Sequence, residues 1–218
     1  MRKWVARVMI VDDHALIRRG LVELIDNEPD LEVCGEAENA ADALALTASA
    51  KPDLLVVDIS LGGMNGLELI KRLRARDENA KILVLSMHDD ELYAERALRA
   101  GATGYVNKNE PPDRLVDAMQ SVLRGGTSFA PAITSRLLQR SVGKVSSDRD
   151  SYTGQLSDRE LEVFELIGQG VSTREIAEKL HLSVKTIETH REKIKAKLKL
   201  RSGVELGRAA VQWVLEQA

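Results

Sequence analysis

The sequence is poor in cysteine, in aromatic residues and in long apolar segments. Its 218 residues include one cysteine, Cys34, and aromatic residues make up 3% of the chain. A single cysteine cannot form an internal disulfide or a thiolate metal cage. Cys34 lies in an apolar stretch, so we expect a buried, inert thiol. No apolar run approaches the roughly 20 residues that span a bilayer. Charged residues near the start stand where a signal peptide would be apolar, so we expect a cytoplasmic protein with no membrane partner.

Charge is divided unevenly along the chain, although the formal net charge is only −3. Residues 1–126 contain 16 basic and 22 acidic residues, whereas residues 127–218 contain 15 basic and 12 acidic residues. Within the second part, the stretch 183–201 contains seven basic and two acidic residues. Opposite charge in the two parts predicts two domains with different partners.

The first 126 residues alternate short apolar runs with longer amphipathic stretches. The apolar runs predict strands at 8–11, 32–35, 54–57, 82–85 and 104–106. The amphipathic stretches predict helices at 14–27, 40–50, 66–76, 90–100 and 112–124. Five such units predict an α/β fold, a flavodoxin-like doubly wound sheet of five parallel strands in the order 2-1-3-4-5.

The rest of the chain has a helical pattern after a polar connection. We expect one short helix over 129–139 and a Ser- and Gly-rich linker over 140–155. Ser157 and Ser172 each begin an S-x-x-E capping box, and further helices are predicted at 184–199 and 203–216. The expected domains are therefore 1–126, a connecting segment over 127–154, and an all-α domain of four helices over 155–218.

Five polar residues stand at the ends of predicted strands. Asp12 and Asp13 follow the first strand, Asp58 ends the third, Ser86 ends the fourth and Lys108 follows the fifth. The carboxyl ends of parallel strands meet at one edge, so these side chains are expected to lie together. Three adjacent carboxylates repel unless a cation joins them, and oxygen ligands favour Mg²⁺. An aspartate in such a site can be a nucleophile that forms an aspartyl phosphate.

Strand ends also carry Asp and Ser merely as turn residues or helix caps. One such residue would favour that interpretation, but five of them at the same predicted edge argue for a site. His14 follows Asp13 and could suggest another metal ligand. We expect it instead to be a first-turn helix residue at the rim of the pocket.

Residues 7–126 resemble the receiver domain of two-component response regulators. The matching features are Val11-Asp12-Asp13, Asp58 with the loop Gly62-Gly63-Met64-Asn65-Gly66, Ser86, Gly101-Ala102-Thr103-Gly104-Tyr105, and Lys108. The resemblance implies that Asp58 is the phosphoacceptor. It also implies that Asp13, Asp58 and the Ser60 backbone carbonyl bind Mg²⁺, with Asp12 acting through a water molecule.

The same resemblance assigns roles to the far side of the pocket. Ser86 and Lys108 would contact the phosphoryl oxygens, and Tyr105 would be the aromatic residue whose rotamer follows Ser86. Two features depart from the family pattern: Asn109 stands where many receivers have proline, and Leu61-Gly62-Gly63-Met64 replaces the usual Met-Pro. These departures leave the chemistry intact and change the expected loop geometry.

The predicted helix 184–199 is apolar on one side and basic on the other. Its apolar stripe consists of Val184, Ile187, Ile194 and Leu198. An adjoining stripe consists of Lys185, Glu188, Thr189 and Glu192, with basic residues around it. A basic helix after a tight turn suits insertion into the major groove of DNA. The alternative is a charged face that is merely solvated.

Residues 155–218 resemble the LuxR-type helix-turn-helix domain. The matching segments are Leu156–Val163, Gly170–Ala177 and Leu182–His190. By family position, the base edges would be contacted by Lys185, Glu188 and Thr189, and the phosphates by Thr186, His190, Arg191 and Lys193. Glu188 stands where several relatives have lysine, and a carboxylate there would accept from cytosine N4.

Together the two resemblances predict a transcription regulator of the NarL/FixJ class. A histidine kinase would phosphorylate it, it would bind double-stranded operator DNA as a homodimer, and it would turn over no small molecule. The first alternative is a Mg²⁺-dependent phosphatase of the haloacid-dehalogenase type. That family needs Asp-x-Asp, whereas this chain has Asp58-Ile59-Ser60. The second alternative is a signalling module whose helical tail binds protein.

Overall fold

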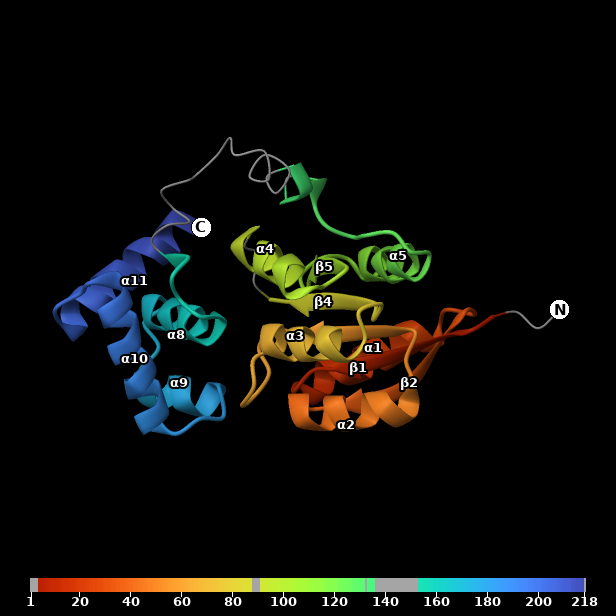
Figure 1. The fold of residues 1–218 in the computed structure, drawn as a ribbon, viewed down its shortest axis with the longest axis horizontal. Helices are drawn as coiled ribbons and strands as arrows, with labels where there is room; N and C mark the ends of the chain where they lie inside the picture. Colours follow the sequence, from red (N-terminus) through yellow and green to blue (C-terminus); the bar gives the residue numbers. More distant parts are fainter. Residues whose placement is uncertain (1–3, 88–90, 132, 136–152, 218) are drawn as a thin grey trace. The chain divides into compact units, whose positions relative to one another are not determined.

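The chain forms two compact units, Met1–Leu137 and Leu138–Ala218. The computed structural model describes residues 4–87, 91–131, 133–135 and 153–217, so the division itself falls outside the described residues. Figure 1 colours the first unit from red to green and the second in blue shades. Among the described helices, none is both long and apolar enough to cross a membrane.

Five parallel strands form the sheet of the first unit. They are β1 (Ala6–Val11), β2 (Leu31–Ala37), β3 (Leu54–Asp58), β4 (Ile82–Ser86) and β5 (Gly104–Asn107). Their order is β2-β1-β3-β4-β5, which confirms the flavodoxin-like topology. All five predicted strands are present, and each extends at least one residue further than its apolar run.

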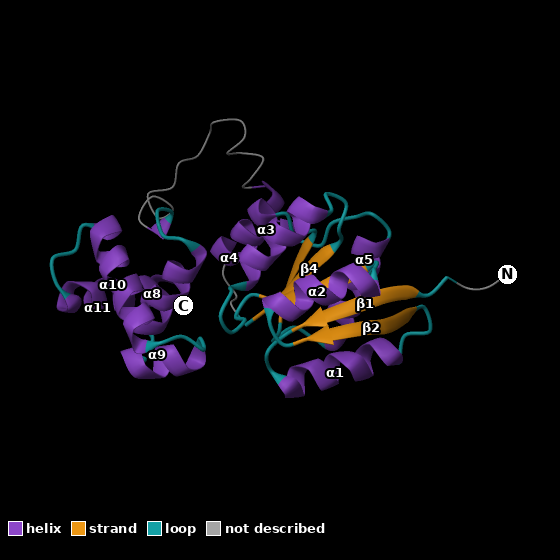
Figure 2. Ribbon diagram, turned by 60° about the horizontal axis from the view of Figure 1, so that its bottom comes forward, coloured by secondary structure: helices purple, strands orange, loops and turns teal. Residues whose placement is uncertain are grey.

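Five helices cover the two faces of this sheet. They are α1 (Ala15–Asp26), α2 (Ala40–Ala50), α3 (Gly66–Arg76), α4 (Glu91–Ala100) and α5 (Pro112–Leu123). Helix α1 contacts α5, whereas α3 contacts both α2 and α4, as expected for a layer of helices on each face (Figure 2). The predicted helices agree to within about two residues, except that the predicted start at residue 90 lies outside the described residues.

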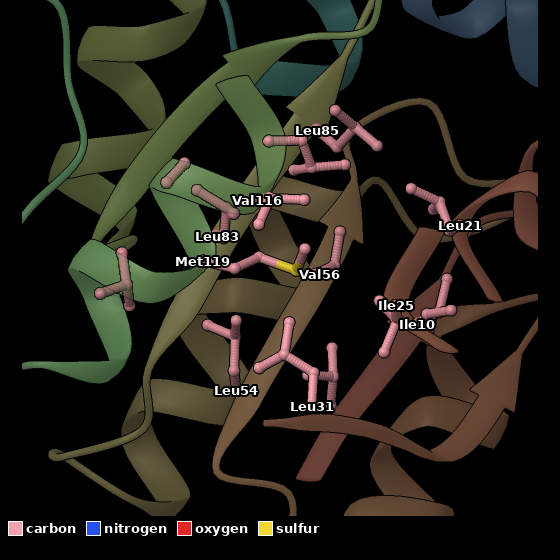
Figure 3. Packing of buried hydrophobic residues seen from close by; sticks show 14 of the residues in the cluster. Ile10, Leu21, Ile25, Leu31, Leu54, Val56, Leu83, Leu85, Val116 and Met119 are labelled. Atoms are coloured by element: carbon pink, nitrogen blue, oxygen red, sulfur yellow. The ribbon is translucent and has the colours of Figure 1, made fainter. Parts of the chain in front are cut away.

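Alternate strand residues point into the core beneath α1 and α5. Figure 3 shows Ile10, Val56 and Leu83 from three neighbouring strands packed with Ile25 and Met119 from those helices. Strand residues that point to the other face of the sheet are buried as well, since β3 and β4 are buried at every position. Burial on both faces explains why these strands read as continuous apolar runs, and it gives the residues at their carboxyl ends a rigid support.

In its described residues, the second unit contains the four helices that are labelled α8 to α11 in Figure 1. They are α8 (Asp158–Gly168), α9 (Thr173–Lys179), α10 (Val184–Leu198) and α11 (Gly203–Gln217). Both predicted capping boxes form completely, at Ser157 with Glu160 and at Ser172 with Glu175. Helices α8 and α11 pack so closely at Gly168 that a Cβ on this residue would come within 2.4 Å of the Ala210 carbonyl oxygen.

Two details of the second part differ from or extend the sequence predictions. Val184 is 43% exposed, whereas the other three members of the apolar stripe of α10, Ile187, Ile194 and Leu198, are buried. Val184 is the first residue of this helix. The predicted helix over 129–139 and the linker over 140–155 fall largely outside the described residues.

Candidate functional site

The centre of the candidate site is a buried lysine between two aspartates. Nζ of Lys108 donates to Oδ2 of Asp12 at 2.6 Å and to Oδ2 of Asp58 at 2.7 Å. The side chains of Asp12 and Asp58 are 2% exposed and that of Lys108 is 5% exposed. The ends of strands β1 and β3 and the segment after β5 therefore bring these groups together as predicted.

Asp13 completes the acidic group and is oriented by the loop after β3. Its Oδ2 accepts from the backbone N–H of Gly62 at 3.1 Å. Its Oδ1 is buried and lies 2.8 Å from Nδ1 of His14, an ion-pair distance. Asp12, Asp13 and Asp58 together form an oxygen-rich carboxylate set, which is what Mg²⁺ prefers. The residues therefore fit a divalent cation at this position.

The loop after β3 is tightly built around the backbone of Asp58. Oδ1 of Asp58 accepts from the N–H of Ser60 at 3.3 Å. A Cβ on Gly66 would come within 2.0 Å of the Asp58 carbonyl oxygen, so this position needs glycine. The side chain of Asn65 is buried and caps α3 by accepting from the N–H of Leu67 at 2.9 Å. Gly63 has a φ of +79°, a left-handed conformation that glycine adopts without strain.

Ser86 and Lys108 lie on neighbouring strand ends. The N–H of Lys108 donates to the Ser86 carbonyl at 2.8 Å, and Ser86 is fully buried. Beyond them, the N–H of Asn109 donates to Oδ1 of Asn107 at 2.8 Å. A proline at position 109 could not make this bond, so this side-chain turn is how the chain accommodates the departure from the family pattern.

Tyr105 is the half-buried residue of β5. Its backbone N–H donates to the Ser128 carbonyl at 2.8 Å, which joins the segment after α5 to this strand. The bridge between Gly104 and Ser128 continues the same pairing. Residues near 128 therefore pack with the first unit, although the sequence pattern marked a boundary at residue 126.

The electrostatics of the site follow from burial and from the lysine. Burial raises the pKa of Asp58, and the nearby Lys108 only partly offsets that effect. Burial alone would lower the pKa of Lys108, but the charges of Asp58 and Asp12 outweigh it, so this pKa is raised. The lysine is therefore held as a cation, while the Asp58 carboxylate is held at a free-energy cost.

This cost predicts a pH dependence of stability. Because the pKa of Asp58 is raised in the folded state, the folded chain binds more protons than the unfolded chain above about pH 4, so its stability falls as pH rises. An Asp58→Asn variant has no carboxylate at this position, so its stability does not fall with pH for this reason. It keeps the Lys108–Asp12 pair. With EDTA present, we expect it to be more stable than the wild type at pH 7, with a smaller difference near pH 4.

Hydrogen exchange of the β3 amides, corrected for intrinsic exchange rates, measures this difference for the first unit alone. Exposed Asp117 lies on α5, so Asp117→Asn provides a matched control without the effect. A gap between Asp58→Asn and wild type that is constant with pH would contradict the assigned cause.

Sequence reasoning missed one residue behind the pocket. Arg18 of α1 is buried, and its Nη1 donates to the Asp12 carbonyl at 2.7 Å. The same guanidinium contacts Glu38 and Glu36 near the end of β2. It thereby joins the carboxyl ends of β1 and β2. An arginine on a helix carries no local signal for such a role, which depends on tertiary contacts.

The second unit places the predicted DNA-contacting residues along α10. Four of them are exposed, namely Lys185, Glu188, Thr189 and Lys193. The other three are half-buried, namely Thr186, His190 and Arg191. The hydroxyl of Thr189 donates to the Lys185 carbonyl at 2.9 Å, so it presents its oxygen as an acceptor. Exposed and half-buried residues therefore form a continuous polar side, opposite the buried side of the helix.

His190 differs from the other predicted phosphate contacts. Burial and the nearby Arg159 lower its pKa, and its Nδ1 is a buried atom with no hydrogen-bond partner among the described residues. A neutral imidazole would contact a phosphate through a hydrogen bond rather than through charge. Its position against α8 makes it a packing residue as well.

Two of the basic residues counted in this helix are already paired. Lys197 donates to Glu160 of α8 at 2.5 Å, and this pair contributes to a lowered pKa of Glu160 despite the opposing effect of burial. Lys195 lies 2.8 Å from Glu192 on the same helix. Lys197 therefore anchors α10 to α8, which the charge count alone did not reveal.

The first unit is a doubly wound sheet with three aspartates, a serine and a lysine at its carboxyl edge, and the second is a helix-turn-helix unit. This combination defines a class of protein, the response regulators with a DNA-binding output domain. Residues 8–120 match the response regulator receiver domain family, and residues 154–210 match the LuxR family of bacterial regulatory proteins. The chain belongs to the NarL/FixJ class of response regulators and is a transcriptional regulator of a two-component system. The phosphatase alternative has no support from either family match.

Similar proteins extend over nearly the whole chain. The oxygen regulatory protein NreC of Staphylococcus carnosus (strain TM300) is 38% identical over 204 residues, covering 92% of this chain and 94% of NreC. A LuxR-family response regulator from Aurantimonas sp. SI85-9A1 is 37% identical with a TM-score of 0.58, covering 63% of this chain and 99% of that one. RcsB of Salmonella typhimurium is 25% identical with a TM-score of 0.66, covering 96% of this chain and 98% of RcsB.

Proposed function

We propose that Asp58 accepts a phosphoryl group from a histidine kinase and that this modification controls DNA binding through the second unit. The observation that carries the proposal is the buried arrangement in which Lys108 contacts both Asp12 and Asp58. Structural ion pairs seldom join one cation to two buried carboxylates beside a third, because burying such charges is costly. A site that must bind a cation and a phosphoryl group accounts for that cost.

The transfer itself needs positioning and charge neutralisation more than further chemistry. A carboxylate oxygen of Asp58 attacks phosphorus while the P–N bond of a phosphohistidine breaks, and the leaving imidazole nitrogen takes a proton from solvent. Asp13, Asp58 and the Ser60 carbonyl would hold Mg²⁺ directly, and Asp12 would hold it through water. When bound, this ion neutralises charge on the phosphoryl oxygens.

The phosphorylated state rearranges the far side of the pocket. Lys108 exchanges its contact with the Asp58 carboxylate for the phosphoryl oxygens, which carry about two negative charges. The Ser86 hydroxyl donates to one of these oxygens, and Tyr105 turns toward the space that Ser86 leaves. Since Tyr105 is half-buried on β5, this movement changes the surface beside that strand.

Operator affinity is proposed to come from a homodimer. One recognition helix covers a single half-site, and two half-sites about one helical turn apart need two copies of α10. RcsB of Salmonella enterica serovar Typhimurium, 25% identical with a TM-score of 0.61, is known bound to promoter rprA in the presence of phosphomimetic BeF₃⁻. We extend that behaviour to this chain as a regulator that works in the cytoplasm and turns over no small molecule.

On DNA, Lys185, Glu188 and Thr189 would read base edges, and Thr186, His190, Arg191 and Lys193 would contact phosphates. Lys193→Ala is therefore expected to weaken binding to all sequences and to reduce the slope of log affinity against log salt by about one unit. Glu188→Ala is expected to relax the preference at one base position by about 1–3 kcal/mol. Affinities for a set of single-base operator variants at several salt concentrations measure both effects.

Arg208→Ala is a matched control, because Arg208 is an exposed basic residue on α11 of the same unit. It should leave both the salt slope and the base preference unchanged. Equal losses across all sequences for Glu188→Ala and Lys193→Ala would mean that a different side of α10 faces the groove.

A further inference from the structure

Asn107 is a buried polar residue at the carboxyl end of β5, and the turn that follows fixes its orientation. The residue is 6% exposed. Its Oδ1 accepts from the N–H of Asn109 at 2.8 Å, and its own backbone N–H donates to Oε1 of Glu110 at 3.1 Å. Because Oδ1 is the acceptor in this turn, the two ends of the carboxamide are distinguished, and Nδ2 is the end available to another partner.

Nδ2 of Asn107 is a buried donor without an acceptor. Among the described residues, no group accepts a hydrogen bond from it. Leaving a buried donor unpaired costs free energy, and most buried polar groups in proteins are paired for that reason. A state of the protein that brings an acceptor within reach of Nδ2 recovers this cost and is favoured by it.

The residue opposite Asn107 on the neighbouring strand is Ser86. The two are paired in the parallel register of β4 and β5, and the N–H of Lys108 holds this register by donating to the Ser86 carbonyl at 2.8 Å. The preceding pair, Leu85 with Val106, points into the core beneath α1 and α5. Side chains alternate along a strand, so Ser86 and Asn107 share the other face, on strands about 4.8 Å apart.

We propose that Asn107 is a positioning residue for Ser86: in the phosphorylated state its Nδ2 donates to Oγ of Ser86 while that hydroxyl donates to a phosphoryl oxygen. This inference rests on the proposed function and adds a residue to it. A serine hydroxyl has one donor and two acceptor lone pairs, so it makes both bonds at once. Hydrogen bonds in such a chain strengthen one another. Asn107 thereby stabilises the phosphorylated state without touching the phosphoryl group.

Titration of the full-length protein with beryllofluoride at fixed Mg²⁺ and fluoride, followed by NMR of the β4 and β5 amides, tests the effect. Asn107→Ser removes Nδ2 and keeps a hydroxyl that can accept from the N–H of Asn109. We expect the beryllium concentration at half-conversion to rise about fivefold, or about 1 kcal/mol. Asn109→Ser is the matched control, since it changes an exposed side chain and keeps the same backbone donor. It should titrate like the wild type.

The Ser86→Ala background separates positioning from a merely structural role. Without the hydroxyl, Nδ2 has no acceptor to gain, so adding Asn107→Ser to Ser86→Ala should cause no further loss of beryllofluoride affinity. A structural defect at position 107 would instead cause the same loss in both backgrounds.

The side-chain amide signals of Asn107 report the hydrogen bond directly and need no substitution at this position. At saturating beryllofluoride, one of the two Nδ2 protons should shift downfield and exchange more slowly with solvent in the wild type, and neither change should occur in Ser86→Ala. Unchanged amide signals in the wild type, or equal beryllofluoride affinities of wild type and Asn107→Ser, would overturn this inference and leave the phosphoacceptor site standing. A wild type that does not bind beryllofluoride would overturn the proposed function as well.

Discussion

An Asp58→Asn variant is expected to gain no phosphoryl group from acetyl phosphate and Mg²⁺, whereas the wild type gains one. The substituted amide side chain lacks the anionic oxygen that attacks phosphorus, and no other acidic residue of the group has Lys108 beside it and the Ser60 N–H on its second oxygen. The expected effect is complete loss. Intact-protein mass spectrometry under mildly acidic conditions, where acyl phosphates survive, measures it.

Two controls make this result specific. Asp117→Asn changes an exposed aspartate on α5 and should label like the wild type. Removal of divalent cations with EDTA should suppress labelling of the wild type. Full labelling of Asp58→Asn would show that the phosphoacceptor lies elsewhere, and labelling that is undiminished by EDTA would contradict the need for a cation.

The second large effect is expected from Lys108→Met, which removes the only cationic side chain that donates to Asp12 and Asp58 in the described structure. The side chains of both aspartates are 2% exposed, so the variant leaves buried charges unpaired. Breaking such a pair typically costs about 3–5 kcal/mol. We expect a loss of about 3 kcal/mol in the stability of the first unit at pH 7 with EDTA present, measured by hydrogen exchange of its strands.

Added Mg²⁺ should restore much of this loss, because a bound cation replaces the missing positive charge. Lys81→Met is a suitable comparison, since Nζ of Lys81 donates to the Leu123 carbonyl outside the acidic group. Its stability should not respond more strongly to Mg²⁺ than that of the wild type. A Lys108→Met protein as stable as the wild type in EDTA would contradict the electrostatic account of the site.

Much of the fold could be predicted because short local patterns in the sequence indicate it. Continuous apolar runs such as Leu54–Val57 mark strands that are buried on both faces, and serine capping boxes mark where helices begin. The polar residues Asp58 and Ser86 stand out because each ends an apolar strand. Parallel topology then brings these strand ends to one edge, which is why the acidic group followed from the sequence.

The remaining features depend on tertiary contacts that no local pattern encodes. Arg18 joins two strand ends through its guanidinium, and Lys197 anchors one helix to another through Glu160. Both residues look like ordinary surface charges in the sequence. Val184 fits an apolar stripe by spacing, yet it is exposed at the start of its helix.

The central claim is that the state of Asp58 controls DNA binding by a dimer. The most direct measurement is a titration of a genomic DNA fragment, recovered by footprinting with the wild-type protein, with and without beryllofluoride at fixed salt. The wild type should bind a fragment with two half-sites about 100-fold more tightly with beryllofluoride, a coupling of about 2.7 kcal/mol. Asp58→Asn should not respond, and a fragment with one half-site should lose most of the gain. Equal wild-type affinity with and without beryllofluoride, or an equal response from Asp58→Asn, would contradict the claim.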